Sequence, residues 1–279
     1  MADAGLTPAG WRATAPDLVA ECAEEWGLCL GDPYVPGVVG HVVRAELADG
    51  TPAVLKVFWP HREAEQEADA LELWGGAGAV RLLARDDARS ALLLERCEPG
   101  THLSAAGAET ALDVLIGLLP RLWKPAGPPF RPLADEAAWW LSYLPRHWEE
   151  SGRPFERGLL DAAVAALTGL RETQGEQVLL HQDLHAENIL AAEREPWLAI
   201  DPKPLSGERE FSVAPIVRGS ELGHSKREVL HRFDRLTSEL GLDRERARGW
   251  AIGQTLAWAY ESAWLSDHLD VVRWLLEAR

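Results

Sequence analysis

Cysteine is scarce in this chain, and the few cysteines present exclude several kinds of site. There are three among 279 residues, Cys22, Cys29 and Cys97, so they cannot all pair with one another. None has the C-x-x-C spacing that is typical of zinc and redox sites. Free thiols are the normal state in a reducing compartment. We therefore expect reduced cysteines and a cytoplasmic protein.

Long apolar runs are also missing. The longest one, near residues 111–122, is interrupted by Asp113, Pro120 and Arg121 and is too short to cross a bilayer. The first thirty residues carry six charged side chains and no uninterrupted apolar core, which argues against a secretory signal. We expect a soluble protein with no membrane partner.

Basic residues are few relative to acidic ones. Lys and Arg total 28 against 44 Asp and Glu, which gives a formal net charge of −16. Such a chain repels nucleic-acid backbones and anionic lipid surfaces, and no basic stripe offsets the effect. We therefore expect no nucleic-acid partner, whereas a cationic small molecule would be attracted. The 47 % hydrophobic and 26 % charged content is that of an ordinary globular protein.

The N-terminal third predicts five strands with one inserted helix, preceded by another helix. A capping-box pattern at Thr14–Asp17 predicts the start of a helix that ends at Gly27. Helical spacing returns over 62–74, and Asp49-Gly50 is a hairpin signal. Runs typical of β-strands lie at 34–39, 41–47, 53–59, 80–83 and 91–95.

Beyond the breaker cluster Glu98-Pro99-Gly100, the pattern becomes mainly helical. We therefore expect an α+β protein of two domains, residues 1–97 and 98–279. One strand-rich segment, 178–200, interrupts the second domain. Helices are expected at about 104–123, 134–150, 154–173, 224–240, 243–266 and 268–278.

The strongest chemical signal is a polar loop between apolar strands. Asp183 is followed five residues later by Asn188, and Asp201 comes thirteen residues after that. Phosphoryl transfer from a nucleotide needs one carboxylate that orients the acceptor hydroxyl and takes its proton. It also needs an amide oxygen and a second carboxylate that hold Mg²⁺ against the phosphates. The spacing predicts this chemistry.

The segment 181–188, His-Gln-Asp-Leu-His-Ala-Glu-Asn, resembles the H-x-D-x-x-x-x-N loop of the aminoglycoside phosphotransferases. The Ile-Asp-Pro-Lys sequence at 200–203 and the glycine-rich run at 74–83 resemble the branch of streptomycin 6-kinases and hydroxyurea phosphotransferases. The resemblance implies a protein-kinase-like fold of two lobes. Its smaller lobe has a five-stranded antiparallel sheet and one helix, and its larger lobe is mainly helical.

The same resemblance assigns the residues of the loop. It makes Asp183 the catalytic base, Asn188 and Asp201 the Mg²⁺ ligands, and His181 the residue that holds the loop. ATP and Mg²⁺ are the implied cofactors. The implied reaction transfers the γ-phosphate of ATP to a hydroxyl of an aminoglycoside of the streptomycin type.

Lys56 is a single charged residue inside the apolar strand Ala53–Phe58. A buried ammonium is costly unless a carboxylate or phosphate lies beside it. The kinase pattern implies that Lys56 binds the α- and β-phosphates and pairs with a glutamate of the next helix. Glu63, Glu65 and Glu67 are candidates, and Glu67 matches the family position best.

The remaining nucleotide contacts are implied by position alone. Gly37 and Gly40 fall in the hairpin that covers the phosphates in this family, although a full G-x-G-x-x-G is missing. Glu95 and Cys97 fall where the family hinge offers backbone groups to the adenine ring. Carboxylates available for a cationic acceptor are Glu208, Glu221, Glu261, Asp267 and Asp270.

Three alternatives stay open. The acceptor could be hydroxyurea or another small hydroxylated metabolite, since such kinases share the catalytic residues and differ in the helical lobe. A pseudokinase is disfavoured because Lys56, Asp183, Asn188 and Asp201 are all present. A metal-dependent hydrolase would use His181, Asp183 and His185, which alternate along the chain and could share one face of a strand.

Overall fold

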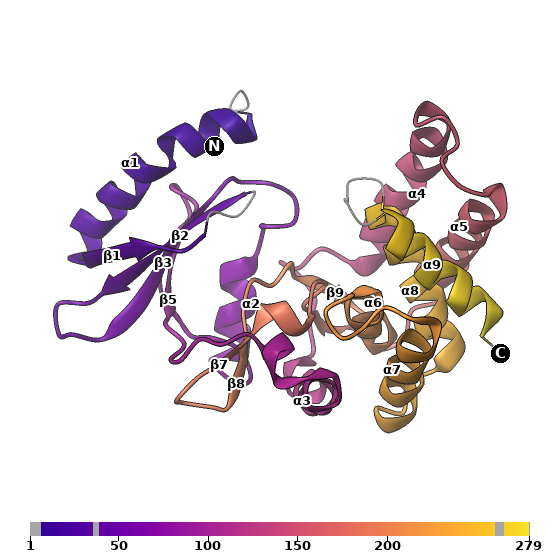
Figure 1. Ribbon diagram of the computed structural model, residues 1–279. Coiled ribbons are helices and arrows are strands. Elements are labelled where there is room, and N and C mark those ends of the chain that lie inside the picture. Colours follow the sequence, from indigo (N-terminus) through magenta and orange to yellow (C-terminus); the bar gives the residue numbers. More distant parts are fainter. Residues whose placement is uncertain (1–6, 36–38, 260–264, 279) are drawn as a thin grey trace. The chain divides into compact units, whose positions relative to one another are not determined.

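The computed structural model describes residues 7–35, 39–259 and 265–278 and divides into two compact units. The first unit consists of Met1–Thr101 and Leu190–Lys203, and the second of His102–Ile189 and Pro204–Arg279. Figure 1 labels their helices and strands. The sequence boundary at 97–98 lies four residues earlier, and the stretch 190–203 belongs with the N-terminal unit. Backbone hydrogen bonds explain its placement, since Ala191 pairs with Gly100 and Thr101, and Ala199 with Gly78 and Val80.

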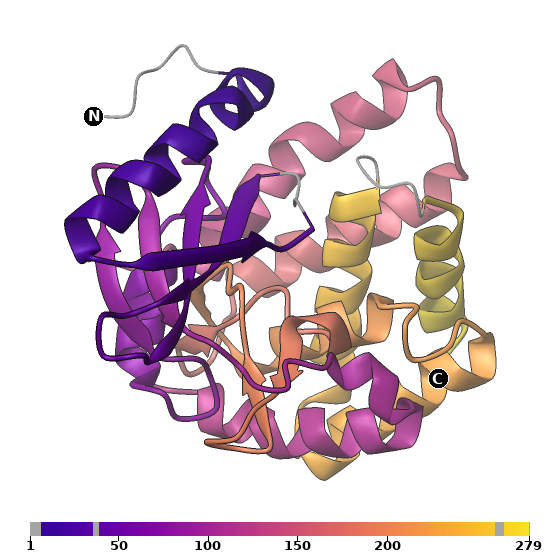
Figure 2. The same cartoon turned by 60° about the vertical axis from the view of Figure 1, so that its left-hand side comes forward.

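The first unit is built on a five-stranded antiparallel sheet in the order β1-β2-β3-β5-β4 (Figure 2). The predicted number of strands is therefore right, but residues 36–38 of the run expected at 34–39 lie outside the described residues, and the strand at 29–33 was not predicted. All five of its residues are exposed, so no alternation of apolar and polar residues marks it. The strands are β1 (Cys29–Pro33), β2 (Gly40–Glu46), β3 (Pro52–Phe58), β4 (Leu82–Asp86) and β5 (Ala91–Glu95).

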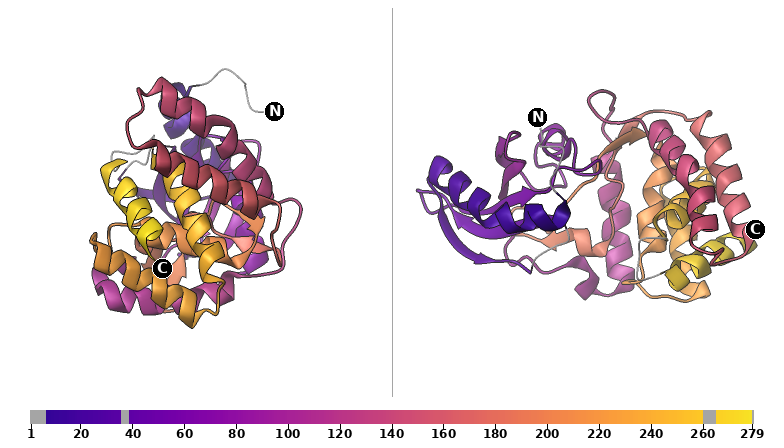
Figure 3. Two further views of the ribbon diagram at one scale, coloured as in Figure 1. Left: turned by 90° about the vertical axis from the view of Figure 1, so that its right-hand side faces the viewer. Right: turned by 90° about the horizontal axis from the view of Figure 1, so that it is seen from above.

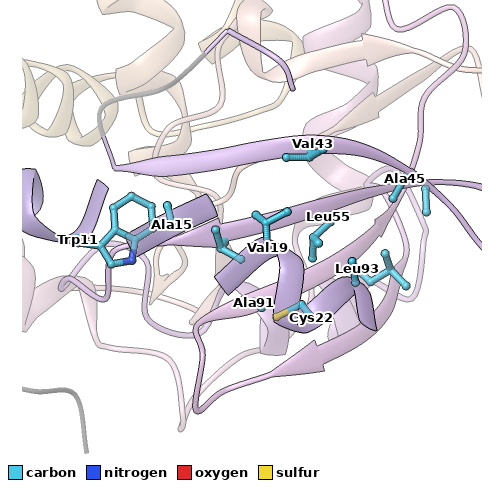
Figure 4. Close-up of a cluster of buried hydrophobic side chains, with 12 residues drawn as sticks. Trp11, Ala15, Val19, Cys22, Val43, Ala45, Leu55, Ala91 and Leu93 are labelled. Atoms are coloured by element: carbon cyan, nitrogen blue, oxygen red, sulfur yellow. The ribbon is translucent and has the colours of Figure 1, made fainter. Parts of the chain in front are cut away.

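Helix α1 (Pro8–Trp26) covers one face of this sheet. Its true N-cap is Thr7, whose side chain accepts the Gly10 N–H. The capping box expected at Thr14 is wrong: Thr14 lies inside the helix, and its hydroxyl donates to the Trp11 carbonyl. Gly27 ends the helix with φ +63°, as expected. Figure 4 shows the apolar side chains of α1 packed on those of β2, β3 and β5.

Helix α2 (Glu67–Trp74) begins five residues later than the periodicity predicts. Gln66 has φ +62°, which no residue inside a right-handed helix adopts, so the preceding residues form turns. The short strands β7 (Ile189–Ala191) and β8 (Trp197–Ala199) pair as a separate hairpin.

The second unit is mainly helical, as expected (Figure 3), and ten of the sixteen residues of α8 are buried. Helix α6 was not expected; it has six residues, contains Pro215 and is followed by Gly219, so no helical period develops. Strands β6 (Val178–Leu180) and β9 (Leu205–Gly207) form an antiparallel pair. The helices are α3 (Ala108–Leu122), α4 (Leu133–Glu150), α5 (Arg157–Arg171), α6 (Val213–Arg218), α7 (Lys226–Glu239), α8 (Arg244–Ala259) and α9 (Leu265–Glu277), with short 3₁₀ turns at Leu103–Ala106, Ala186–Asn188 and Arg209–Ser212.

None of the helices within the described ranges is both long enough and apolar enough to cross a membrane.

Candidate active site

The first group of functional side chains centres on Lys56 of β3. Leu55 and Val57 on either side of it point into the core under α1, so Lys56 points to the other face of the sheet. There its ammonium nitrogen lies 2.7 Å from both carboxylate oxygens of Glu67, the first residue of α2. It lies 2.6 Å from Oδ1 of Asp201, which follows β8. The expected Lys56–Glu67 pair is therefore present, and Asp201 joins it.

Burial and the neighbouring charges shift the pKa values of Lys56 and Glu67 in opposite directions. Burial lowers the pKa of Lys56, but the carboxylates of Asp201 and Glu67 outweigh that effect and raise it, so the ammonium stays charged. Burial raises the pKa of Glu67 against the opposing effect of Lys56. The Asp201 side chain is 47 % exposed, whereas that of Glu67 is 3 % exposed. Only Asp201 therefore offers carboxylate oxygen to a ligand from solvent.

The backbone of Asp201 is unusual. Its φ is +55°, in the left-handed region that a residue with a side chain rarely adopts. Such conformations persist where the surrounding structure holds them, and they cluster at functional sites. Here the conformation turns the carboxylate towards Lys56 directly after β8.

The second group lies in the second unit, in the loop that follows β6. Asp183 is 8 % exposed, and its Oδ1 accepts a hydrogen bond from Nη2 of Arg218 at 3.1 Å. Gln182 before it has φ +64°, and its carbonyl accepts a hydrogen bond from the buried Gln254 side chain at 2.9 Å. His181 is buried at the start of the loop, with 5 % exposure.

Asn188 closes this loop. Its Nδ2 donates to the Asp183 carbonyl at 2.9 Å and lies 3.2 Å from Nε2 of His185. These contacts use the amide nitrogen, so the amide oxygen is directed away from them. An amide oxygen held in this way suits a hard divalent cation.

Two further residues contact the loop: Arg218, which was missed in the sequence, and Glu221, which was expected only as a carboxylate for a cationic acceptor. Arg218, at the end of α6, also lies over the Trp258 ring, 4.3 Å from its centre. Glu221 accepts the Ala186 N–H at 3.1 Å. The signal for Arg218 was available, since a lone charge directly after the apolar run 213–217 needs a partner, as Lys56 does.

The alternative metal site is not assembled. Nε2 of His185 is 3.8 Å from Oδ1 of Asp183, and the Arg218 guanidinium lies on that same oxygen. Across the described part of the chain, no three His, Cys, Asp or Glu side chains are placed to hold a metal ion together.

The residues expected at the adenine and the phosphates lie in different surroundings, and one of them is outside the described residues. Gly37 lies outside the described residues, and Gly40 begins β2 opposite Phe58. The Glu95 carboxylate accepts hydrogen bonds from Arg194 at 2.7 and 2.8 Å and from the Arg81 N–H at 3.0 Å. Burial raises the pKa of Cys97 to about 12, so its thiol stays protonated.

Glu208 is not available to an acceptor, contrary to expectation. It is 2 % exposed and accepts hydrogen bonds from Arg246, from the Trp250 indole and from the Gly175 N–H. These partners fix the carboxylate inside the second unit as a structural ion pair. Glu261 lies outside the described residues.

The fold and these side chains define a small-molecule kinase with a protein-kinase-like architecture. Residues 34–268 match the family model described as "Aminoglycoside/hydroxyurea antibiotic resistance kinase", so the chain belongs to this family of phosphotransferases that act on hydroxyl groups.

Two curated relatives carry names that correspond to the two substrate types in that description. A hydroxyurea phosphotransferase of Kitasatospora aureofaciens is 44 % identical over 246 residues, which cover 86 % of this chain and 71 % of the relative. A streptomycin 6-kinase of Streptomyces griseus is 41 % identical over 253 residues, 88 % of this chain and 82 % of the relative.

The same architecture occurs in the choline kinase LicA from Streptococcus pneumoniae. It matches with a TM-score of 0.68 at 14 % identity, over 95 % of this chain and 100 % of LicA. LicA has also been solved in complex with AMP. At this identity the likeness supports the fold alone.

Proposed function

We propose that this kinase transfers the γ-phosphate of ATP to a hydroxyl of an aminoglycoside of the streptomycin type. The observation that carries the proposal is the group formed by Lys56, Glu67 and Asp201. A buried ammonium that is fixed by one buried carboxylate and faces a half-exposed one is suited to nucleotide phosphates and their cation. Membership of the kinase family and the 41 % identical streptomycin 6-kinase support the substrate class.

Lys56 contacts the α- and β-phosphates in this proposal, and Glu67 holds it in place. Gly37, Gly40 and the backbone at Glu95 and Cys97 bind the rest of the nucleotide. The backbone at Glu95 already lies in the sheet, where its N–H donates to the Arg81 carbonyl. Its side chain is bound to Arg194, so in this proposal the contact of Glu95 with the nucleotide is made through its carbonyl and not through its N–H or its side chain.

Asn188 and Asp201 are the residues that would hold Mg²⁺. Both offer oxygen ligands, the type that this cation prefers, and the hydrogen bonds of Asn188 direct its oxygen away from the loop. When bound, Mg²⁺ neutralises negative charge on the phosphates.

Asp183 is the base that takes the proton of the acceptor hydroxyl. Arg218 and Asn188 hold Asp183 from two sides, one at its carboxylate and the other at its carbonyl. Catalysis of this kind depends mainly on positioning, because the attacking oxygen has to lie in line with the leaving group. His181 supports the start of the loop.

A second acceptor is supported by the relative at 44 % identity, which is named a hydroxyurea phosphotransferase. Hydroxyurea is small and neutral, whereas streptomycin carries guanidinium groups that favour carboxylates. Asp267 and Asp270 on α9 are partly exposed candidates for such contacts, with 31 % and 44 % of their side chains exposed. Streptomycin therefore needs carboxylates in the acceptor site, whereas hydroxyurea does not.

A coupled ADP-release assay with Mg·ATP tests the proposal. The acceptor panel contains streptomycin, other aminoglycosides, hydroxyurea and simple hydroxylated metabolites. We expect release that depends on streptomycin, together with a mass gain of one phosphoryl group on the drug. Release with hydroxyurea alone would replace the acceptor and keep the mechanism, and failure to bind Mg·ATP would overturn the kinase assignment.

A further inference from the structure

A fully hydrogen-bonded buried charge lies in the second unit at Arg232 on α7. It is 2 % exposed, and all five of its N–H groups point at backbone carbonyls. Its Nε donates to Ile216 at 3.1 Å, Nη1 to Leu222 at 3.4 Å and Gly223 at 2.8 Å, and Nη2 to Val217 at 3.0 Å and Gly219 at 2.6 Å.

These carbonyls need partners because the helix that carries some of them ends here. Helix α6 stops at Arg218, and the last carbonyls of a helix have no partner within it. The Gly219 N–H serves the Pro215 carbonyl, and Arg232 serves the next two. A side chain from α7 thus caps α6 and also fixes the connection between the two helices.

None of the hydrogen bonds of Arg232 reaches a carboxylate. Burial lowers its pKa to about 10, against the opposing effects of Glu221 and Glu228, so the guanidinium is still charged near neutral pH. The planar fork of guanidinium donors fixes the positions of all the carbonyl oxygens that it binds. Lysine, with three donors on a single nitrogen, cannot reproduce this arrangement.

The stretch that Arg232 holds, residues 216–223, also supports the loop of Asp183. Arg218 within this stretch donates to the Asp183 carboxylate, and Glu221 accepts the Ala186 N–H. The carbonyls that Arg232 binds flank both residues, with Val217 and Gly219 around the first, and Gly219 and Leu222 around the second. The backbone is therefore fixed on each side of both contacts.

We propose that Arg232 is a positioning residue for phosphoryl transfer, which sets the place of Asp183 through Arg218 and Glu221. The inference rests on the proposed role of Asp183 as the base. Arg232 contacts no substrate. Its effect falls on turnover, since its hydrogen-bond partners include none of Lys56, Glu67 and Asp201.

Arg232→Lys is the main test because it keeps the charge and removes the planar fork. Arg235→Lys is the matched control, three residues further along α7, where the arginine makes only ion pairs at the surface to Glu109, Asp113 and Glu239. Amide hydrogen exchange of the peptide 182–188 reports on the loop without any acceptor. We expect at least fivefold faster exchange there in Arg232→Lys and no change in Arg235→Lys.

Steady-state kinetics give the second readout, with streptomycin as the acceptor probe and hydroxyurea as the second probe. We expect Arg232→Lys to lower kcat at least tenfold while KM for ATP stays within twofold. The double variant Arg218→Lys with Arg232→Lys should lose less kcat than the product of the two single losses, because Arg232 acts in part through Arg218. A purely structural role predicts independent, multiplying losses and a parallel change in KM.

Several outcomes overturn the inference. These are a folded Arg232→Lys protein with wild-type exchange in the loop, with wild-type kcat, or with losses that multiply with those of Arg218→Lys. If Arg232→Lys does not fold, Glu221→Ala is the substitute test. Unchanged loop exchange and kcat in that variant would show that the contact between Glu221 and the Ala186 N–H does not position the loop. If the wild type phosphorylates neither probe, the proposed function fails separately, and loop exchange still tests the positioning.

Discussion

The two units carry ionic groups of opposite composition. In the first, one ammonium, Lys56, lies between two carboxylates, Glu67 and Asp201, and one of these is half exposed. In the second, one carboxylate, Asp183, lies against one guanidinium, Arg218. A group with surplus negative charge at its exposed side suits a cation with phosphates, whereas a balanced pair suits the proposed role of Asp183 as proton acceptor. The difference predicts a division of labour between nucleotide binding and turnover.

The sharpest way to break this comparison is Asp183→Asn. The amide keeps the shape of the side chain but cannot take a proton from the acceptor, so we expect kcat to fall about a thousandfold, within the usual range for a lost general base. Binding of Mg·ATP, measured by calorimetry, should stay within twofold. Glu109→Gln on α3 is the surface control. Turnover close to wild type in Asp183→Asn would remove the mechanism.

Asp201→Ala probes the other unit. Since this carboxylate is the exposed member of the Lys56 group, we expect Mg²⁺-dependent binding of ATP to weaken about a hundredfold, with turnover lost along with it. Binding measured with and without Mg²⁺ separates the cation from the nucleotide. Asp87→Ala, an exposed carboxylate of the same unit, serves as control. Equal Mg²⁺ dependence in Asp201→Ala and wild type would show that the carboxylate only pairs with Lys56.

The sequence predicts one part of this comparison well because that part is local. Asp183 and Asn188 lie five residues apart on one loop, and their hydrogen bond closes it. Lys56 was found because a charge inside an apolar strand needs a partner, and Glu67 lies on the next helix. Four of the five strands of the sheet followed from short apolar runs and a hairpin turn in the same way, whereas the fully exposed β1 did not.

The rest depends on packing between distant segments. Asp201 meets Lys56 across 145 positions of sequence, and Arg218 meets Asp183 across 35. Helix α6 is too short to show a period, and it is stabilised by Arg232 from another helix. Glu208 has a carboxylate, the group that a cationic acceptor would bind, but tertiary contacts bury it. Sequence pattern carries no record of such contacts.

A smaller effect is expected for Lys56→Met. Methionine keeps the apolar stem of the side chain, so we expect kcat/KM for ATP to fall about tenfold to a hundredfold through loss of phosphate contacts alone. The variant also leaves Glu67 buried without its cation, which is destabilising. The double variant Lys56→Met with Glu67→Gln removes both charges and separates the two effects. If the double variant keeps the wild-type kcat/KM, Lys56 has only a packing role.

The smallest expected effect is on the free energy of unfolding at low pH. It separates the two units because the second one contains a buried histidine that titrates in this range. His268 on α9 is buried; burial lowers its pKa to about 4, and the charge of Arg218 adds to this, while His224 acts in the same direction and Asp267 opposes. The folded state therefore binds this proton later than the unfolded chain does. Its contribution to stability is complete above about pH 6.5 and is lost as pH falls towards 4.

The loss amounts to on the order of 3 kcal/mol at pH 4 from this one residue. His268→Gln removes the titration, so its free energy of unfolding should fall less than that of the wild type between pH 7 and pH 4. Denaturant unfolding followed by tryptophan fluorescence measures this, with the exposed His231→Gln on α7 as control. Lys56 itself adds no such dependence, because its ammonium stays charged throughout this range, and the raised pKa of Glu67 acts in the opposite direction, towards greater stability as pH falls. An identical pH dependence in His268→Gln and wild type would mean that other groups set the acid sensitivity, and the second unit would then lose the titrating group that distinguishes it from the first.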